Sequence, residues 1–259
     1  MLRIGLLSDI HAHRHDQEED VDALIQHINA QPAPDVLVCA GDISHHTGEV
    51  DRFLRRIHHD APKCWVPGNH DVWVIDRESD EDSAQLRYEQ VFPRISAEAG
   101  WWYLPGNPLP LANTDLAIVG SIGWFTGEGF SEWFDQPSGQ RDMDLAHRLA
   151  EALRADVARL PSATRLIIVT HHVGHRSAPS HDPTQGNVWS SALEELIEDL
   201  ADRVVAVLHG HRHVRYEPRC IDGKLFAAHP FGYPHQHSRV EDGYRVVVLP
   251  NDSGHEQTR

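Results

Sequence analysis

The chain has 259 residues and a formal net charge of −16, because 39 acidic side chains outnumber 23 basic ones. Such an acidic excess disfavours an extended nucleic-acid-binding surface, which would need clustered basic side chains. A hydrophobic share of 40% suffices for a globular core, but no apolar run approaches the roughly 18 residues of a membrane span.

Strand-like and helix-like segments alternate in the first half of the chain. The run LRIGLLS at residues 2–8 predicts a strand. Residues 18–29 predict a helix, because their apolar side chains recur at helical spacing. Continuous apolar runs predict further strands, of the kind that is buried in parallel sheets. These strands are expected at 35–41, 63–68 and 101–104, with helices at 49–59 and 83–98.

The second half continues this alternation. Helices are expected at residues 142–160 and 190–200, and strands at 116–124, 165–172 and 203–213. The C-terminal runs at 215–223, 224–229 and 244–250 alternate like antiparallel strands joined at turns such as Asp222-Gly223. Two inserts rich in Gly, Pro and polar residues, near 125–141 and 173–189, predict long loops.

The alternation predicts an α/β protein that forms a single domain over residues 1–259. Its three cysteines, Cys39, Cys64 and Cys220, are far apart in the sequence and odd in number. They suggest no disulfide framework and favour a reducing compartment. We therefore expect a cytoplasmic protein that does not bind a membrane.

Metal-binding residue types follow five of the predicted strands. Asp9 and His11 follow the first strand, and residues two apart on a strand point to the same side. The other four strands end in Gly41-Asp42, Asn69-His70-Asp71, His171-His172 and the stretch from His209 to His213. In α/β sheets the ligand site lies at the carboxyl ends of the strands, so we expect these side chains to converge.

The ligand types favour two metal ions rather than one. Carboxylate, amide and imidazole groups without cysteine disfavour a structural zinc site. The set is too large for one ion and suits two divalent cations such as Mn, Fe, Zn or Co. Two ions ~3.5–4 Å apart can hold the attacking and leaving oxygens of a phosphoryl displacement.

The order of these motifs resembles the calcineurin-like metallophosphoesterases. The resemblance rests on Asp9-x-His11, Gly41-Asp42, Gly68-Asn69-His70-Asp71, Thr170-His171 and Gly210-His211-x-His213. It implies a four-layer α/β/β/α sandwich of the calcineurin-like metallophosphoesterase type. It also implies hydrolysis of a phosphoester by in-line attack of a metal-bridging hydroxide.

The resemblance further implies a role for each motif residue. Asp9, His11 and His213 would hold one ion, Asn69, His171 and His211 the other, and Asp42 would bridge them. His70 would be the catalytic imidazole that stabilises phosphoryl charge or protonates the leaving group. In part of the family an acidic residue stands where this chain has His45, so the partner that orients His70 is left open.

Other polar residues are candidates for indirect or substrate contacts. Asp71 is expected to support its turn or orient a neighbour, and His172 is the alternative to His171. Arg176 is a candidate phosphate contact, and so is Arg212, although alternation along its strand turns Arg212 away from His211 and His213. Loop histidines such as His13 are expected to be solvated. The candidates for indirect or substrate contacts are His45, Asp71, His172, His209 and His229.

A small phosphoester is the expected substrate, and a phosphodiester such as a cyclic or small nucleotide is favoured over a protein phosphate. The Gly-Asn-His-Asp motif and the compact length support this preference. A phosphomonoesterase or a nuclease on the same site remains an alternative. A non-enzymatic metal-binding scaffold is disfavoured, because every expected ligand position is filled. The sequence leaves the native metals and the oligomeric state open.

Overall fold

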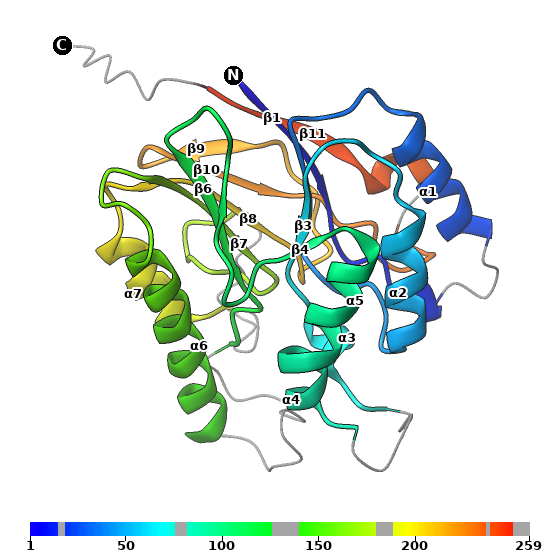
Figure 1. The fold of residues 1–259 in the computed structure, drawn as a ribbon, viewed down its shortest axis with the longest axis horizontal. Helices are drawn as coiled ribbons and strands as arrows, with labels where there is room; N and C mark the ends of the chain where they lie inside the picture. Colours follow the sequence, from blue (N-terminus) through cyan, green and yellow to red (C-terminus); the bar gives the residue numbers. More distant parts are fainter. Residues whose placement is uncertain (15–18, 76–81, 126–139, 180–188, 237–238, 251–259) are drawn as a thin grey trace.

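The computed structural model describes residues 1–14, 19–75, 82–125, 140–179, 189–236 and 239–250. Most of the two predicted inserts, residues 126–139 and 180–188, lies outside this described part. The described residues form two sheets with helices on their outer faces (Figure 1). None of the described helices is both long and apolar enough to cross a membrane.

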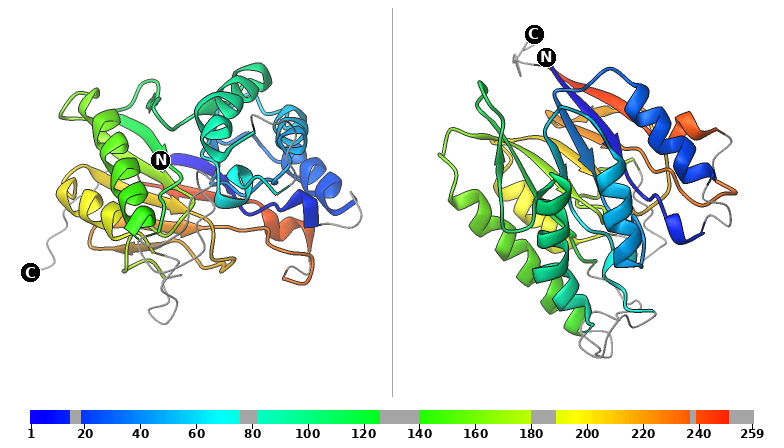
Figure 2. Two further views of the ribbon diagram at one scale, coloured as in Figure 1. Left: turned by 90° about the horizontal axis from the view of Figure 1, so that it is seen from below. Right: turned by 45° about the vertical axis from the view of Figure 1, so that its right-hand side comes forward.

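The first sheet contains the N-terminal strand at its centre. Its strand order is β11 (Arg245–Leu249), β1 (Leu2–Leu7), β2 (Val36–Cys39), β3 (Lys63–Trp65) and β4 (Trp102–Tyr103). The strands from β1 to β4 pair in parallel, and β11 runs antiparallel to β1. Figure 2 shows β1 and β11 side by side, although they come from opposite ends of the chain.

The second sheet is built from the middle and later parts of the chain. Its strand order is β5 (Leu109–Pro110), β6 (Leu116–Ser121), β7 (Arg165–Thr170), β8 (Val204–His209), β10 (Lys224–Ala228) and β9 (Arg219–Ile221). The four central strands, from β6 to β10, pair in parallel, whereas β5 and β9 are antiparallel edge strands.

The main helices separate into two groups (Figure 2). Helices α1 (Glu19–Ala30), α2 (Thr47–Arg56) and α5 (Phe92–Ala99) cover the first sheet, and α6 (Gln140–Ala158) and α7 (Ser191–Asp199) cover the second. The short helical segments are η1 (Ala12–Arg14), α3 (Asn69–Val72), α4 (Ala84–Leu86), η2 (Arg87–Val91) and η4 (Val240–Gly243).

Side-chain alternation along the strands explains this layered packing. Ile4 and Leu6 of β1 pack with Ile167 and Val169 of β7 between the two sheets. The intervening side chains point outward, so Ile168 of β7 packs with the residues of α6 and α7 instead. Strands buried on both faces need continuous apolar runs, as the sequence has. The four-layer α/β/β/α sandwich is therefore confirmed.

Two predicted segments differ from the structure. The helix expected at residues 83–98 is divided by the π-helical segment η2. Pro93 follows that segment and has no N–H to give to the carbonyl of Glu89, so ordinary α-helical bonding is broken there. In the C-terminal region β9 and β10 do form an antiparallel hairpin at Asp222-Gly223. However, β10 also pairs in parallel with β8, and β11 joins the other sheet.

Candidate metal centre

The carboxyl ends of strands from both sheets meet at one place. Asp9 and Asp42 follow β1 and β2, and Asn69 begins α3 just after β3. His171 and His211 follow β7 and β8 of the second sheet. The contacts described next join these residues across the two sheets, so the predicted convergence is present.

Asp9, His11 and His213 form the first group of possible ligands. His213 Nε2 lies 3.4 Å from Asp9 Oδ1 and 2.8 Å from His11 Nε2. Ligand atoms of all three residues lie within 4.8 Å of one another. Since metal–nitrogen and metal–oxygen bonds are about 2.0–2.2 Å long, these atoms are close enough to hold one cation.

Asp42, Asn69, His171 and His211 form the adjoining group. His171 Nε2 lies 3.2 Å from Asp42 Oδ2 and 3.1 Å from Asn69 Oδ1. His211 Nδ1 lies 3.0 Å from the same oxygen of Asn69. Asp42 Oδ2 is also 3.7 Å from His11 Nε2, so one carboxylate oxygen faces both groups.

Two carboxyl groups of the centre are buried. Asp9 and Asp42 are 0% and 1% exposed. Burial alone would raise the pKa of each carboxyl group, but neighbouring imidazoles hold both pKa values below their usual range. Burial likewise opposes a charged His171, yet the Asp42 carboxylate outweighs it and raises the pKa of His171 to about 9. Two buried carboxylates need positive partners, which divalent ions would supply.

Hydrogen bonds outside the centre orient two of its imidazoles. His171 donates from Nδ1 to the carbonyl oxygen of Ala40 over 2.8 Å, so Nε2 is the nitrogen that faces Asp42. His213 donates from Nδ1 to Gln236 Oε1 over 2.7 Å, which leaves its Nε2 facing Asp9. Such outer hydrogen bonds commonly fix the tautomer of metal-binding histidines. The donor set therefore fits metal ions.

Left-handed backbone conformations, rather than strand alternation, aim the candidate ligands. β1 ends at Leu7, and Asp9 and His11 have φ angles of 53° and 48°. Asp9 and His11 were expected to point to the same side because they lie two residues apart on a strand. This expectation is wrong, since both residues follow the end of β1. Among the described non-glycine residues, positive φ occurs at Asp9, His11, Asp42, Asn113, His211, His213 and Asp222. Five of these seven are candidate ligands, and strained backbone typically gathers at functional sites.

Two glycines allow the loops after β2 and β3 to touch. A Cβ atom on Gly68 would lie 2.1 Å from Asp42 Oδ1. Gly41 has a φ of 86°, and a Cβ atom there would lie 2.5 Å from the backbone nitrogen of Gly68. Neither contact is sterically possible, so both positions require glycine.

Asp71 ties the same two loops together. Its Oδ2 accepts hydrogen bonds from the backbone N–H groups of Asp42 and Gly68, at 2.8 and 2.7 Å. Its Oδ1 accepts from the backbone of Ile43 and Ser44, at 2.8 and 2.9 Å. The carboxylate thus supports the turn that presents Asp42 and Asn69.

Asp71→Asn is expected to lower the free energy of unfolding by ~2–4 kcal/mol. The amide places an NH₂ group against two backbone N–H donors, so two buried hydrogen bonds are lost and the donors are left unsatisfied. Urea unfolding followed by tryptophan fluorescence measures the change. Asp115→Asn is the matched control, because Asp115 is 55% exposed and pairs with Arg165 at the surface. Equal losses in both variants would contradict this role of Asp71.

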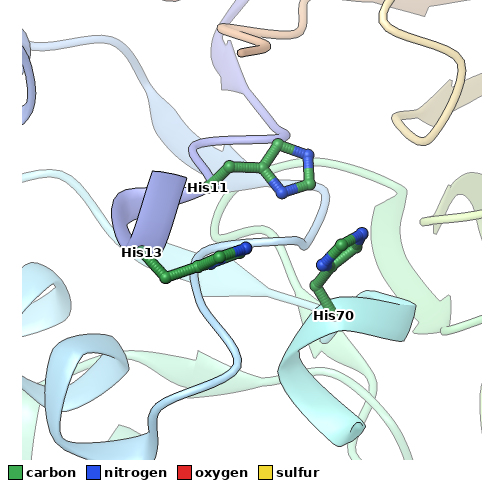
Figure 3. A group of neighbouring side chains, drawn as sticks. All are labelled: His11, His13 and His70. Atoms are coloured by element: carbon green, nitrogen blue, oxygen red, sulfur yellow. The ribbon is translucent and has the colours of Figure 1, made fainter. Parts of the chain in front are cut away.

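His70 lies beside the centre in a cluster of imidazoles. Figure 3 shows His11, His13 and His70 around a common space. The His70 ring is 4.7 Å from that of His11 and 5.4 Å from that of His13, and Trp73 packs on it at 4.4 Å. The backbone N–H of His70 donates to Asp42 Oδ1 over 2.8 Å. Burial is the main reason that the pKa of His70 is lowered.

His13 and His45 extend this cluster. Their ring centroids are 3.6 Å apart, and His45 is 6.4 Å from the ring of His70. Within the described part of the chain, both nitrogens of His13 are buried and have no hydrogen-bond partner. Burial, followed by the neighbouring His45, lowers the pKa of His13 to about 2. The expectation that His13 is a solvated loop residue is therefore wrong.

His172 and His209 lie behind the candidate ligands. His172 faces the carbonyl oxygen of Ile122 with Nδ1, at 3.2 Å, and its ring is 4.2 Å from that of His211. His209 has partners at both nitrogens, the carbonyl oxygen of Gly210 and the hydroxyl group of Tyr216. Both rings are thus placed to support the loop that presents His211.

His229 lies between the end of β10 and Pro230, which pairs with Ser8, whereas Arg176 pairs with Glu194. The charged groups that act on His229 are Arg215, Asp242 and Arg245. Arg176 donates to Glu194 Oε1 over 2.6 Å, and its guanidinium group lies over Trp189. Arg176 thus has a partner outside the candidate ligand groups, and the role suggested for His229 stays a prediction.

Sequence reasoning missed three residues next to the centre. Gln236 binds His213 as described above, and Tyr233 packs on His11 and His213 with ring centroids 4.5 and 4.7 Å away. Arg14 lines a pocket together with Tyr233. Tyr233 and Gln236 fall in the stretch FGYPHQH, which matches none of the five motifs.

Comparisons with known proteins agree with this geometry. The sequence matches the profile of the calcineurin-like phosphoesterases over residues 2–215. A comparison with curated protein sequences found no match. The fold is similar to phosphopantetheinyl hydrolase from Mycobacterium tuberculosis, with 19% identity and a TM-score of 0.75 over 95% of this chain and 96% of that one.

A 5'-nucleotidase described as putative, from Staphylococcus aureus, has 12% identity and a TM-score of 0.51, over 87% of this chain and 48% of that one. At such identities both likenesses concern the fold. The family profile, by contrast, covers most of the chain and includes each candidate ligand. The chain therefore belongs to the calcineurin-like phosphoesterase family, whose members hydrolyse phosphoesters with bound metal ions.

Proposed function

We propose that the protein is a binuclear metal-dependent phosphodiesterase that acts on small phosphodiesters. The observation that carries this proposal is the position of Asp42, whose Oδ2 faces ligand atoms of two adjoining groups. Asp9, His11 and His213 would hold one ion, and Asn69, His171 and His211 the other, with Asp42 between them. Mn, Fe, Zn and Co all suit this mixture of oxygen and nitrogen ligands.

The ions would supply an acidified water molecule as nucleophile and positive charge for the phosphoryl oxygens. The residues of the chain would position the groups that bind the ions. Asp71 keeps the loops of Asp42 and Asn69 in contact, as its four backbone hydrogen bonds indicate. Gln236 and Ala40 hold the tautomers of His213 and His171.

His70 is the proposed acid for the leaving group. Its side chain is 8% exposed and its ring lies at the edge of the centre, next to His11. Packing on Trp73 fixes the ring, and the hydrogen bond to Asp42 fixes its backbone. In its protonated form, a positioned imidazole of this kind can give a proton to the leaving oxygen as its bond to phosphorus breaks.

The surroundings of His70 support a diester over a monoester. His11, His13 and His45 line this side of the centre. Imidazoles carry less positive charge than the arginine clusters that bind a phosphate dianion. A singly charged phosphodiester needs less compensation, so it suits this environment better. The name of the fold neighbour, phosphopantetheinyl hydrolase, agrees with a small organic phosphoester as substrate. The similarity between the two proteins concerns the fold alone.

Metal content and turnover in one Mn²⁺-supplemented preparation test this function. We expect about two metal ions per chain and faster hydrolysis of bis-p-nitrophenyl phosphate than of p-nitrophenyl phosphate or single-stranded DNA. Faster hydrolysis of the monoester or of DNA would replace the diesterase by one of these alternatives. No bound metal and no turnover of any of the three would leave a scaffold role.

A further inference from the structure

Arg87, the first residue of the π-helical segment η2, is a fully buried arginine. Its Nε and Nη2 atoms donate to the two carboxylate oxygens of Asp82, over 2.9 and 2.6 Å. A buried charge is costly unless it is paired, and this two-bonded ion pair supplies the partner. The remaining nitrogen, Nη1, faces the loops that carry the imidazole cluster beside the metal centre.

This Nη1 atom joins the backbones of two loops. It donates to the carbonyl oxygen of His45 over 2.7 Å and to that of Trp73 over 2.9 Å. The carbonyl oxygen of Asp71 lies 3.4 Å from the same nitrogen. Asp71 and Trp73 stand at the C-terminal end of α3, where carbonyl groups lack partners within the helix. Basic side chains can satisfy such carbonyl groups, so Arg87 caps the short helix that carries His70.

Different side chains hold the two ends of α3. At the N-terminal end, the carboxylate of Asp71 bonds the backbones of Asp42 and Gly68 and so supports the candidate ligands. At the C-terminal end, Arg87 holds the carbonyl groups. A helix of four residues has too few internal bonds to keep its shape alone. Loss of Arg87 should therefore disturb the part of α3 around His70 more than it disturbs the metal ligands.

The groups that Arg87 holds belong to neighbours of the His70 ring. The Trp73 ring packs on that of His70 with centroids 4.4 Å apart, and the His45 ring is 6.4 Å away. Within the described part of the chain, Nδ1 of His70 is buried and has no hydrogen-bond partner. Packing and the backbone therefore set the direction of this ring, rather than a hydrogen bond at Nδ1.

We propose that Arg87 is a positioning residue for His70: through the carbonyl groups of His45 and Trp73, it keeps the proposed acid directed at the leaving oxygen. The π-helical geometry of η2 agrees with this role, because such segments frequently occur at functional sites. The inference rests on the proposed function, in which His70 is the acid, and adds a residue to the same site.

Arg87→Lys in the Mn²⁺-loaded protein tests this role. Lysine keeps a positive charge for Asp82 but lacks the planar fork that also reaches the two carbonyl groups. The substrate is diphenyl phosphate, whose leaving phenol is a weaker acid than p-nitrophenol and so depends more on a proton donor. We expect an unchanged metal content and a kcat about tenfold to a hundredfold lower, with KM changed by less than about threefold, because a displaced catalytic group slows the chemical step.

A double-mutant cycle distinguishes positioning of His70 from a general structural role. Arg87→Lys added to His70→Ala should lower kcat by less than about threefold further, because the group that Arg87 positions is then already absent. Asp82→Asn is the second variant, should Arg87→Lys not fold. It keeps the shape of the side chain but removes the charge that holds the guanidinium group. Its loss of kcat should be smaller than that of Arg87→Lys and should likewise vanish in the His70→Ala background.

Arg203→Lys is the matched control. Arg203 also donates to two backbone carbonyl groups, those of Thr164 and Pro161, over 2.9 and 3.1 Å. It precedes β8, at the end of the strand opposite to His211. Its substitution therefore removes the same kind of bond away from the metal centre and should leave kcat unchanged.

Nuclear magnetic resonance reports the placement of His70 without turnover. In Zn²⁺-loaded protein with carbon-labelled histidine, the Cε1–H signal that is missing from His70→Ala belongs to His70. We expect this signal to shift in Arg87→Lys and to keep its position in Arg203→Lys. An unchanged signal in Arg87→Lys would overturn the inference. So would a loss of metal, or a loss of kcat as large in the His70→Ala background as in the wild-type protein.

The two readouts separate this inference from the proposed function. Hydrolysis of phosphodiesters by the wild-type protein, with the same kcat and the same His70 signal in Arg87→Lys, would remove the role of Arg87 and leave the phosphodiesterase standing. A His70 signal that depends on Arg87, without hydrolysis of any phosphodiester, would keep the placement of His70 by Arg87 and remove the enzymatic function.

Discussion

Asp42→Ala is expected to leave fewer than one metal ion per chain and to reduce phosphodiester turnover to the uncatalysed level. Asp42 Oδ2 faces His171 at 3.2 Å and His11 at 3.7 Å, so its loss affects both proposed ion positions. Removal of one buried charged partner also leaves the others uncompensated, which is among the costliest changes in a protein interior. Both the metal content and the rate should therefore fall together.

Inductively coupled plasma mass spectrometry of protein prepared with Mn²⁺ measures the occupancy. Asp42→Asn is the companion variant, because Asp42 has a φ of 58° and asparagine tolerates this conformation better than alanine does. If Asp42→Asn keeps the circular dichroism spectrum but loses metal, the carboxylate charge is what the ions require. Asp115→Ala, at the exposed surface, controls for a general effect of lost negative charge. Full occupancy in either Asp42 variant would refute the bridging role.

The elements of the fold could be predicted from the sequence because their signals are local. Strand β7 was expected at residues 165–172 and spans Arg165–Thr170, since a buried strand needs a continuous apolar run. Helix α1 was expected at 18–29 and spans Glu19–Ala30, since its apolar side chains recur at helical spacing. The partner of β11 could not be predicted in this way. β11 pairs with β1 through contacts between the two ends of the chain, and no local pattern encodes them.

The sequence predicted which residues come together at the candidate site, but not the backbone conformation that orients them. Motif order identified the residues that the structure brings together, from Asp9 to His213. Strand alternation was the expected cause of their orientation. In the structure, positive φ angles at Asp9, His11 and Asp42 orient these side chains instead. Such conformations arise from the tertiary contacts that hold a loop, among them the four backbone hydrogen bonds of Asp71. A sequence pattern shows these contacts only indirectly, as the glycines at positions 41 and 68.

Residues outside the motifs were missed for a similar reason. Gln236 lies 23 positions after His213, and nothing in its neighbours marks it as the acceptor for that imidazole. His13 carried a usable signal, because it repeats the spacing from Asp9 to His11 by a further two positions. Its burial depends on stacking against His45 from another loop, so the spacing alone could not place it.

His70→Ala is expected to lower kcat by ~10²–10⁴-fold while both metal ions remain bound. The imidazole is not among the two ligand groups, and its contacts are with the rings of His11, His13 and Trp73. Its backbone bond to Asp42 survives the substitution, so the loop should keep its shape. Metal content measured as for Asp42→Ala, together with kcat, distinguishes these two variants. An unchanged kcat would remove His70 from the mechanism.

The dependence of this loss on the leaving group distinguishes two roles for His70. An acid that protonates the departing oxygen matters most when the leaving alcohol is weakly acidic, and least for p-nitrophenolate, which departs without a proton. We therefore expect the loss in His70→Ala to be about tenfold or more greater for an alkyl phosphodiester than for bis-p-nitrophenyl phosphate. An equal loss for both substrates would instead assign His70 to stabilisation of charge on the phosphoryl oxygens. His13→Ala is the matched control from the same cluster, and its loss should be less than tenfold for both substrates. A larger loss in His13→Ala than in His70→Ala would move the acid to His13, whose buried nitrogens face the same space as those of His70.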